Sequence, residues 1–404
     1  MEGQLLEWLA FLVRWIHVIA GIAWIGASFY FIWLDQSLVP TTGEKAARGL
    51  KGELFAIHGG GIYEVGKYQL APPQMPETLH WFKWEAYTTW LSGSALLIVI
   101  YYVRAQSYLI GADTWVQTPA TAITASVLYL LTILGLYEAT IRSPLKDRPL
   151  IFALLITIVV TLASWIAWQL FTPRAAMLHV GAALATIMAG NVFLGIIPAQ
   201  KGLVAAIERG VNPDAGPALL AKLRSTHNNY FTLPVLFCML GNHAPFLYTG
   251  SMAWLMVVAL SLTAATARHF FNLRNQGRHQ PGWLIGPAVA FCALVLVSVS
   301  LSSSTDRVAS NLAESDRVDH AEIAQIMTKH CTPCHARAPA FPGYATPPAG
   351  LLFEQPEDLR GDTNAFPVDQ IRTALVSSYM PLGNLTGMTP EERSKLIAWL
   401  PPKH

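Results

Sequence analysis

Residues 149–171, PLIFALLITIVVTLASWIAWQLF, contain no charged side chain and are rich in Leu, Ile and Val. A helix of this length can cross the hydrocarbon core of a bilayer, which is about 30 Å thick. Seven further stretches have the same character, so we predict eight spans, at residues 8–34, 84–103, 119–139, 149–171, 175–197, 229–248, 252–273 and 282–302. The sequence therefore predicts an all-α fold built on an eight-helix transmembrane bundle.

The overall composition agrees with a multi-pass membrane protein. Hydrophobic residues make up 53% of the chain and charged residues only 13%, against about 25% charged in a typical soluble domain. A lipid bilayer is the expected surrounding. The chain has no long basic run interleaved with aromatic residues, so we expect no nucleic-acid partner.

The Lys and Arg residues predict the orientation of the bundle. The connections after spans one, three, five and seven carry fourteen of them, and those after spans two, four and six carry only Arg104 and Arg174. Basic connections stay in the cytoplasm. Both termini are therefore expected on the opposite side, which in a bacterial inner (cytoplasmic) membrane is the periplasm.

Spans one and five resemble each other. The segments 17–31 and 179–193 align without a gap and share seven identities in fifteen positions, beginning with His17 and His179. If this similarity reflects duplication, the bundle consists of two parallel four-helix repeats in which the two histidines are equivalent. A chance match between two Ala-rich helices is the alternative.

The motif Cys331-Thr332-Pro333-Cys334-His335 predicts a covalently bound haem c. In a Cys-x-x-Cys-His motif the two thiols attach to the haem and the histidine becomes the proximal iron ligand. A thioredoxin-like dithiol would need a βαβ setting, and a zinc site would need two more ligands. Haem is attached to c-type cytochromes outside the cytoplasm, which agrees with the orientation that the basic residues predict.

Met380 is the expected sixth ligand of this iron. It follows a helix-like segment at 369–379 and precedes Pro381. Methionine ligation raises the haem potential and suits an electron acceptor. The competitor is Met388, but it precedes Thr389-Pro390-Glu391-Glu392, which is typical of a capped helix start. We therefore divide the chain into a membrane catalytic domain (1–302), a polar periplasmic tether (303–318) and a class I-like cytochrome c domain (319–404).

Ionisable and amide groups inside the spans are candidate functional residues. Two lie toward the predicted outer face and three toward the inner face; they are His17 and His179, and Glu85, His227 and Asn228. The histidines are suited to ligating a buried b-type haem or to binding a polar substrate. The alternative for each lone histidine is a hydrogen-bonded packing residue.

Four stretches resemble the bacterial membrane-bound, cytochrome c-fused urate oxidases (urate hydroxylase, PuuD type). They are WIHVIAGIAWIGASFY (15–30), LHWFKWEAY (79–87), STHNNY (225–230) and MPLGNLTGMT (380–389). The resemblance implies that urate is oxidised to 5-hydroxyisourate with an oxygen atom from water. It further implies that the electrons leave through the cytochrome to a soluble cytochrome or a terminal oxidase, without hydrogen peroxide.

The candidate residues suit this chemistry. Urate is anionic at neutral pH, so it needs hydrogen-bond donors and a base for its second proton. Histidine and asparagine side chains can serve these roles, and Glu85 could fix the tautomer of a histidine. A reaction near the inner face would leave electrons about 30 Å of hydrocarbon to cross, which requires a relay. Otherwise the site lies in the outer half, near His17 and His179.

Two other functions are consistent with the same pattern. The first is an oxidoreductase of the same plan with another donor, such as a quinol or a different heterocycle. The second is a permease or an electron conduit fused to a cytochrome c. Anchoring a cytochrome needs only one helix, so eight spans with two polar layers favour an enzyme.

Overall fold

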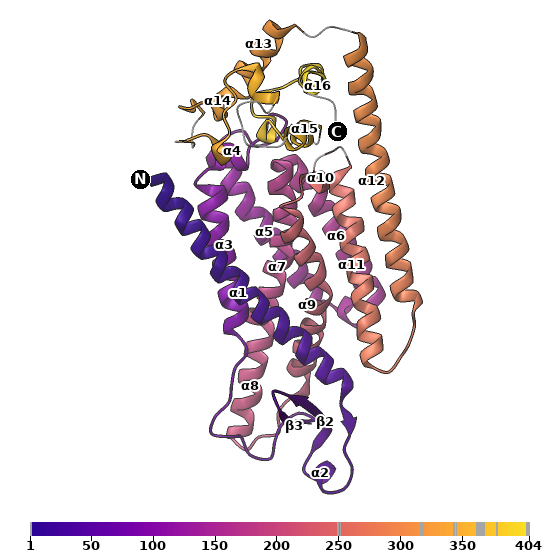
Figure 1. Cartoon of the computed structure of the whole chain (residues 1–404). Coiled ribbons are helices and arrows are strands. Elements are labelled where there is room, and N and C mark those ends of the chain that lie inside the picture. The colour runs from indigo at the N-terminus through magenta and orange to yellow at the C-terminus, as the bar shows by residue number, and fades with distance from the viewer. Residues whose placement is uncertain are drawn as a thin grey trace.

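The computed structural model describes residues 2–248, 250, 252–315, 319–341, 344, 346–360, 368–376 and 379–400. A long helical bundle carries a small C-terminal domain at one end (Figure 1). We refer to residues 319–400 as the C-terminal domain.

Several long helices begin where proline favours a helix start. α5 (Pro119–Arg142), α6 (Pro149–Leu170) and α7 (Pro173–Gly190) each have proline in the first turn, where the missing N–H costs nothing and the fixed φ suits the helix. Thr118 additionally caps α5 by accepting a hydrogen bond from the backbone N–H of Thr121.

The other long helices cover the remaining predicted spans. Two helices contain π-helical stretches, which continue α3 and α7. These elements are α1 (Glu2–Ser37), α3 (Trp84–Leu96), η1 (Leu97–Tyr102), η3 (Asn191–Ile196), α8 (Ile197–Glu208), α9 (Ala215–Gly241), α11 (Ala253–Asn275) and α12 (Gly282–Ser315). Short helices α4 (Ala105–Tyr108), η2 (Pro144–Asp147) and α10 (Pro245–Tyr248) lie in the connections.

Among the described residues, six helices are long and apolar enough to cross a membrane. They are Gln4–Ser37, Pro119–Arg142, Pro149–Leu170, Pro173–Glu208, Ala253–Asn275 and Gly282–Ser300. Two further predicted spans fall on α3–η1 and α9, which are helical but not among these six. α9 is less apolar because it carries Arg224, His227 and Asn228. The count of eight spans therefore stays a prediction.

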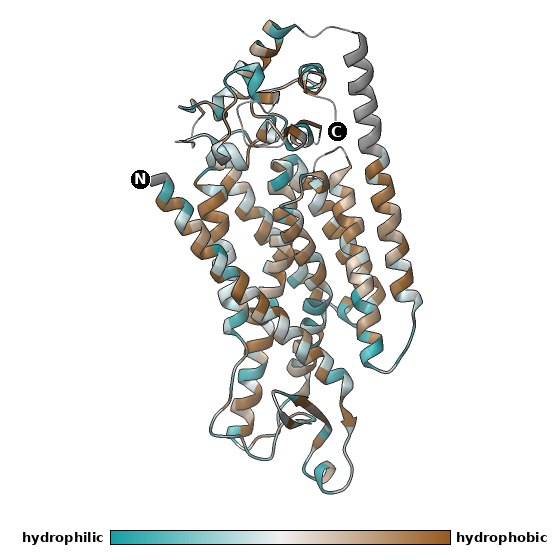
Figure 2. Cartoon of the chain, in the orientation of Figure 1, coloured by the Kyte–Doolittle hydropathy of each residue, from teal (hydrophilic) through white to brown (hydrophobic). Residues whose placement is uncertain are grey.

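Exposed apolar side chains on the bundle fit a lipid environment. Leu150 is 85% exposed and Leu296 is 68% exposed, and Figure 2 shows many hydrophobic residues along α1 and along the coloured part of α12. Contiguous apolar surface of this kind marks contact with a membrane or another protein. The buried core lies between α5, α6, α7 and α9.

The prediction of an all-α fold is wrong in one respect. The first connection forms a three-stranded antiparallel sheet from β1 (Val39–Pro40), β2 (Leu50–His58) and β3 (Gly61–Tyr68), and it also contains the short helix α2 (Gly43–Ala47). Gly59 and Gly60, with φ of 58° and 83°, form the two-residue turn between β2 and β3. Two consecutive residues with positive φ favour glycine and match the twist of a hairpin.

The predicted connections lie at the two ends of the bundle as the sequence indicates. The N-terminus lies at the end of the bundle that carries the C-terminal domain, whereas the hairpin and α8 lie at the opposite end (Figure 1). α12 continues as a helix to Ser315, into the predicted tether, and residues 316–318 lie outside the described part.

The C-terminal domain has its own core. It consists of α13 (His320–His330), α14 (Thr332–His335), η4 (Pro348–Gly350), η5 (Pro356–Arg360), α15 (Val368–Val376), η6 (Leu382–Asn384) and α16 (Pro390–Trp399). Ile323, Ile326 and Met327 are buried in it, as the spacing along 320–330 predicts. The expected capping box at the start of α16 is present between Thr389 and Glu392.

Candidate functional site

The C-terminal domain contains a cavity of about 490 Å³ around the Cys-x-x-Cys-His motif. Cofactor sites typically measure about 300–1,000 Å³ and are mostly apolar. Cys331, Cys334, His335 and Met380 all line this cavity. The structure therefore brings together the four residues that the sequence predicts around a haem.

The histidine of the motif is oriented as an iron ligand would be. Nδ1 of His335 donates a hydrogen bond to the carbonyl oxygen of Leu351 at 3.1 Å. Metal-binding histidines usually donate one ring nitrogen in this way, which leaves the other for the metal. Burial lowers the pKa of His335, so the ring is neutral at pH 7. Both Cys331 and Cys334 are free thiols. These residues fit a covalently attached haem.

The cavity does not by itself select the sixth ligand. Met380 and Met388 both line it. Met388 is only 4% exposed and belongs to the domain core. Met380 is less buried, and its carbonyl oxygen accepts a hydrogen bond from Arg393. Ligation by Met380 therefore stays a prediction.

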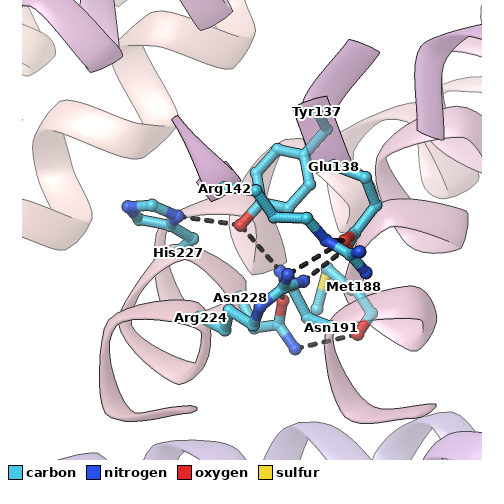
Figure 3. A network of polar contacts seen from close by, with 8 residues as sticks. All are labelled: Tyr137, Glu138, Arg142, Met188, Asn191, Arg224, His227 and Asn228. Atoms are coloured by element: carbon cyan, nitrogen blue, oxygen red, sulfur yellow. Dashed lines mark hydrogen bonds and ion pairs between the residues drawn. The ribbon is translucent and has the colours of Figure 1, made fainter. Parts of the chain in front are cut away.

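A second group of polar residues lies inside the bundle, and we call it the bundle network (Figure 3). It consists of Tyr137 and Glu138 of α5, Asn191 of η3, and Arg224, His227 and Asn228 of α9. The centre is the ion pair between Arg224 and Glu138, in which both terminal nitrogens of the guanidinium donate to the carboxylate. Arg224 also donates to Oδ1 of Asn191 at 2.9 Å.

The arginine determines the direction of every hydrogen bond that follows. Arginine has no acceptor, so Oδ1 of Asn191 faces Arg224 and Nδ2 must donate. It donates to the hydroxyl oxygen of Tyr137 at 3.0 Å and to Oδ1 of Asn228 at 2.8 Å. Nδ2 of Asn228 then donates to the carbonyl oxygen of Met188 at 3.0 Å. The orientation of the Asn191 amide, and with it that of Asn228, is thus fixed by Arg224. A second arginine, Arg142, also donates to the carboxylate of Glu138, at 3.0 Å (Figure 3).

His227 stands at the end of this series of hydrogen bonds. Its Nδ1 lies 2.8 Å from the hydroxyl of Tyr137, and its ring stacks on Phe152 with 4.5 Å between the centroids. Among the described residues, Nδ1 of His227 is the acceptor that lies within hydrogen-bond distance of the Tyr137 hydroxyl, so the phenol hydrogen is directed to it. The neutral ring then carries its proton on Nε2, which makes this half-buried histidine a hydrogen-bond donor.

The π-helical stretch η3 gives the network its local geometry. Single π turns inside α-helices often occur at functional sites, and η3 contains both Asn191 and Gly195. A Cβ atom added to Gly195 would lie 2.4 Å from Cδ of Arg224. Glycine is therefore required there for the arginine to pass close to the backbone.

His179 has the environment of a packing residue. Its Nδ1 donates to the carbonyl oxygen of Ala175 at 2.7 Å, and its Nε2 accepts from the hydroxyl of Ser126 at 2.6 Å. The ring stacks on Phe171 with 4.1 Å between the centroids. Because both ring nitrogens are already hydrogen-bonded, His179 does not fit the axial ligand of a b-type haem.

His17 and Glu85 lie apart from the bundle network in their hydrogen bonding. Nδ1 of His17 faces the carbonyl oxygen of Thr89 at 2.9 Å and the hydroxyl of Ser92 at 3.1 Å, which links α1 to α3. Oε2 of Glu85 is buried and has no hydrogen-bond partner in the part of the chain that the structure describes. Among the described residues, the hydrogen bonds of His17, His179 and His227 go to groups other than Glu85.

The structure thus brings together two of the five predicted catalytic residues, His227 and Asn228. It adds four residues that the sequence alone did not indicate as site residues, namely Tyr137, Glu138, Asn191 and Arg224. Glu138 could have been predicted, because it is a charged residue within the predicted span 119–139. Tyr137 and Asn191 carry no such signal.

A comparison with known families gives one match. The model of the family described as urate oxidase N-terminal matches residues 3–300, which include the whole bundle network and end before the C-terminal domain. Neither a curated protein nor a solved structure matches the chain.

Proposed function

Since the chain belongs to the urate oxidase N-terminal family, we propose that its bundle oxidises urate and that its C-terminal domain carries the electrons away. The observation that carries this proposal is the joining of the matched region, residues 3–300, to a cavity lined by a complete Cys-x-x-Cys-His motif. The proposed product is 5-hydroxyisourate, with its added oxygen from water. No hydrogen peroxide is formed in this scheme, because the electrons do not go to oxygen at this site.

The bundle network supplies groups that suit urate. A purine-like anion is bound best by hydrogen-bond donors, and Nε2–H of His227 is one that the network holds in a fixed orientation. Arg224 is neutralised by Glu138, so its role is to orient Asn191 and, through it, Tyr137 and His227. We propose that His227 binds the substrate and that the other five residues position it.

The C-terminal domain would hold haem c through Cys331 and Cys334, with His335 and Met380 as axial ligands. The bound haem would accept one electron at a time, so each urate would reduce it twice. A soluble cytochrome or a terminal oxidase is the proposed acceptor. We propose the bacterial cytoplasmic membrane as the location, with the N-terminus and the C-terminal domain in the periplasm, because the basic connections favour that orientation.

The cavity of the C-terminal domain and the bundle network lie far apart along the bundle. Arg174 at the cavity and Asn191 in the network are 17 residues apart on one continuous helix, which corresponds to roughly 25 Å at about 1.5 Å per residue. Electrons leaving the network would need a relay over that distance. The alternative is a reaction near His17 in the outer half, and substitutions can separate these two positions.

The test of the function uses anaerobic membranes that contain the full chain. Urate should produce the reduced absorption band of haem c, and dithionite should produce the same band as a positive control. If dithionite reduces the haem and urate never does, the urate proposal is wrong. Reduction by an added quinol in place of urate would instead favour an oxidoreductase with another donor.

The position of the site is tested by histidine substitutions. His227→Ala should slow urate-driven reduction about 100-fold or more, as expected for loss of an oriented donor. His269→Ala is a matched control, because His269 also pairs with a tyrosine hydroxyl, that of Tyr230 at 2.6 Å. A large loss in His17→Ala with normal His227→Ala would place the reaction in the outer half instead.

A further inference from the structure

Arg174 is a bundle residue that reaches the cavity of the C-terminal domain. It lies in the first turn of α7 and lines the cavity together with the bundle residues Tyr108 and Pro245. The two domains touch at this place, since the N–H of Ala112 donates to the carbonyl oxygen of Gly383 at 3.3 Å. Arg174 therefore lies at the junction between the bundle and the cavity that we assign to haem.

The cationic group of Arg174 has no acidic partner among the described residues. Its Nε donates to Oδ1 of Asn242 at 3.3 Å, and the guanidinium lies 5.8 Å from the ring centre of Tyr108. Its two terminal nitrogens make no hydrogen bond to any described residue. A largely buried cation without a counter-ion is unfavourable, so the environment of this side chain is suited to binding an anion.

The described lining of the cavity is free of carboxylate side chains. The described residues that line it include no Asp or Glu. Besides Arg174 and the motif histidine, the described lining contains one more basic residue, His330. Its Nδ1 lies 2.7 Å from the hydroxyl of Thr386, and its Nε2 lies 3.2 Å from Glu392. The partners of His330 are thus already within the C-terminal domain. Of the described residues that line the cavity, Arg174 is therefore the cation that is free to bind a carboxylate ligand.

Haem carries two carboxylate groups, its propionates, and a guanidinium binds carboxylates in a two-pronged geometry. We propose that Arg174 of the bundle binds the propionates of the haem held by Cys331, Cys334 and His335. This inference rests on the proposed haem c. The cofactor of one domain would then be held by a side chain of the other, and it would tie the C-terminal domain to the bundle at the electron-entry side.

The measurement is the midpoint potential of the haem in the purified full-length protein, titrated with dithionite and ferricyanide. A nearby positive charge favours the reduced haem, which carries one positive charge less. Arg174→Gln should lower the equilibrium constant for reduction about tenfold, which is about 59 mV for one electron. Arg337→Gln is the matched control, because Arg337 is exposed on the C-terminal domain and does not line the cavity.

A second measurement covers the case in which Arg174→Gln fails to fold. Arg174→Lys keeps the charge but loses the planar fork, so the propionate bending vibration in the resonance Raman spectrum should shift while the potential changes little. An Arg174→Gln potential equal to that of the wild type would overturn the proposal, as would an equal fall in Arg337→Gln. An unshifted propionate vibration in Arg174→Lys would also overturn it. A wild-type protein without a c-type haem spectrum would instead refute the haem assignment itself.

Discussion

Arg224 and Glu138 form a two-pronged ion pair across the bundle, although 86 residues separate them in the chain. The arginine side chain is 2% exposed and the glutamate side chain 13%. Arg224 also donates to the amide oxygen of Asn191 and so fixes the orientation of that amide. The carboxylate of Glu138 additionally accepts a hydrogen bond from Nε of Arg142.

Removal of one partner should destabilise the protein strongly. Glu138→Gln leaves the buried guanidinium of Arg224 without its counter-ion, which costs about 3–5 kcal/mol. Arg224→Gln should cost less, because Glu138 keeps its ion pair with Arg142 at 3.0 Å. Thermal unfolding in detergent measures the loss. The double variant Glu138→Gln with Arg224→Gln removes both charges and should be more stable than the sum of the two single effects indicates. Strict additivity of the two substitutions would contradict the pairing.

Gly195→Ala should disturb the network without changing any polar group. The added methyl group would lie 2.4 Å from Cδ of Arg224, so the arginine must shift away from Glu138. We expect lower stability and slower urate-driven haem reduction. Gly202→Ala is the matched control, because nothing lies within 4 Å of its added Cβ and alanine favours a helix over glycine by about 1 kcal/mol. Equal behaviour of the two variants would refute the close approach.

The variants Met380→Leu and Met388→Leu should show which methionine ligates the haem iron and which one only packs in the core. Both methionines line the cavity, and the change to leucine conserves volume and usually costs less than about 1.5 kcal/mol. Loss of the thioether ligand in Met380→Leu should lower the haem potential by roughly 100 mV or more, on an axial-ligand scale of about 0.8 V. Met388→Leu should leave the potential unchanged. The reverse result would assign the iron to Met388.

Acid should weaken the C-terminal domain through Glu392. The backbone N–H of Thr389 and the ammonium group of Lys329 lower the pKa of this carboxylate to about 2. A lowered pKa stabilises the folded state above the unfolded value of about 4.3, and this stability is lost as the pH falls from there toward 2.

The comparison for this prediction is Glu392→Gln, which preserves the side-chain hydrogen bond of the capping box. Unfolding followed by haem absorbance should show the wild type more stable than the variant at pH 6. The difference should shrink between pH 5 and pH 3. A difference of the same size at pH 6 and at pH 3 would show that the charge of Glu392 makes no contribution.

The sequence predicted the elements of this protein better than their contacts. Helix α13 spans His320–His330, as the apolar spacing indicates, and the capping box at Thr389 is present. The hairpin of β2 and β3 was missed because glycine-rich connections are compatible with several turns. The pairing of Glu85 with a histidine is not found, since hydrogen-bond partners depend on helix rotation and depth, which hydropathy does not specify.

The local composition of the chain by itself determined the long apolar helices, the charge asymmetry of their connections and the Cys331–His335 motif. These features depend on short stretches, because hydropathy, charge and the spacing of a motif are properties of a few neighbouring residues. Only the tertiary structure decided that Arg224 meets Glu138, that His179 is fully hydrogen-bonded, and that Arg174 reaches the cavity of another domain. Such pairings arise from the packing of helices distant in sequence, and packing is settled by the whole fold at once.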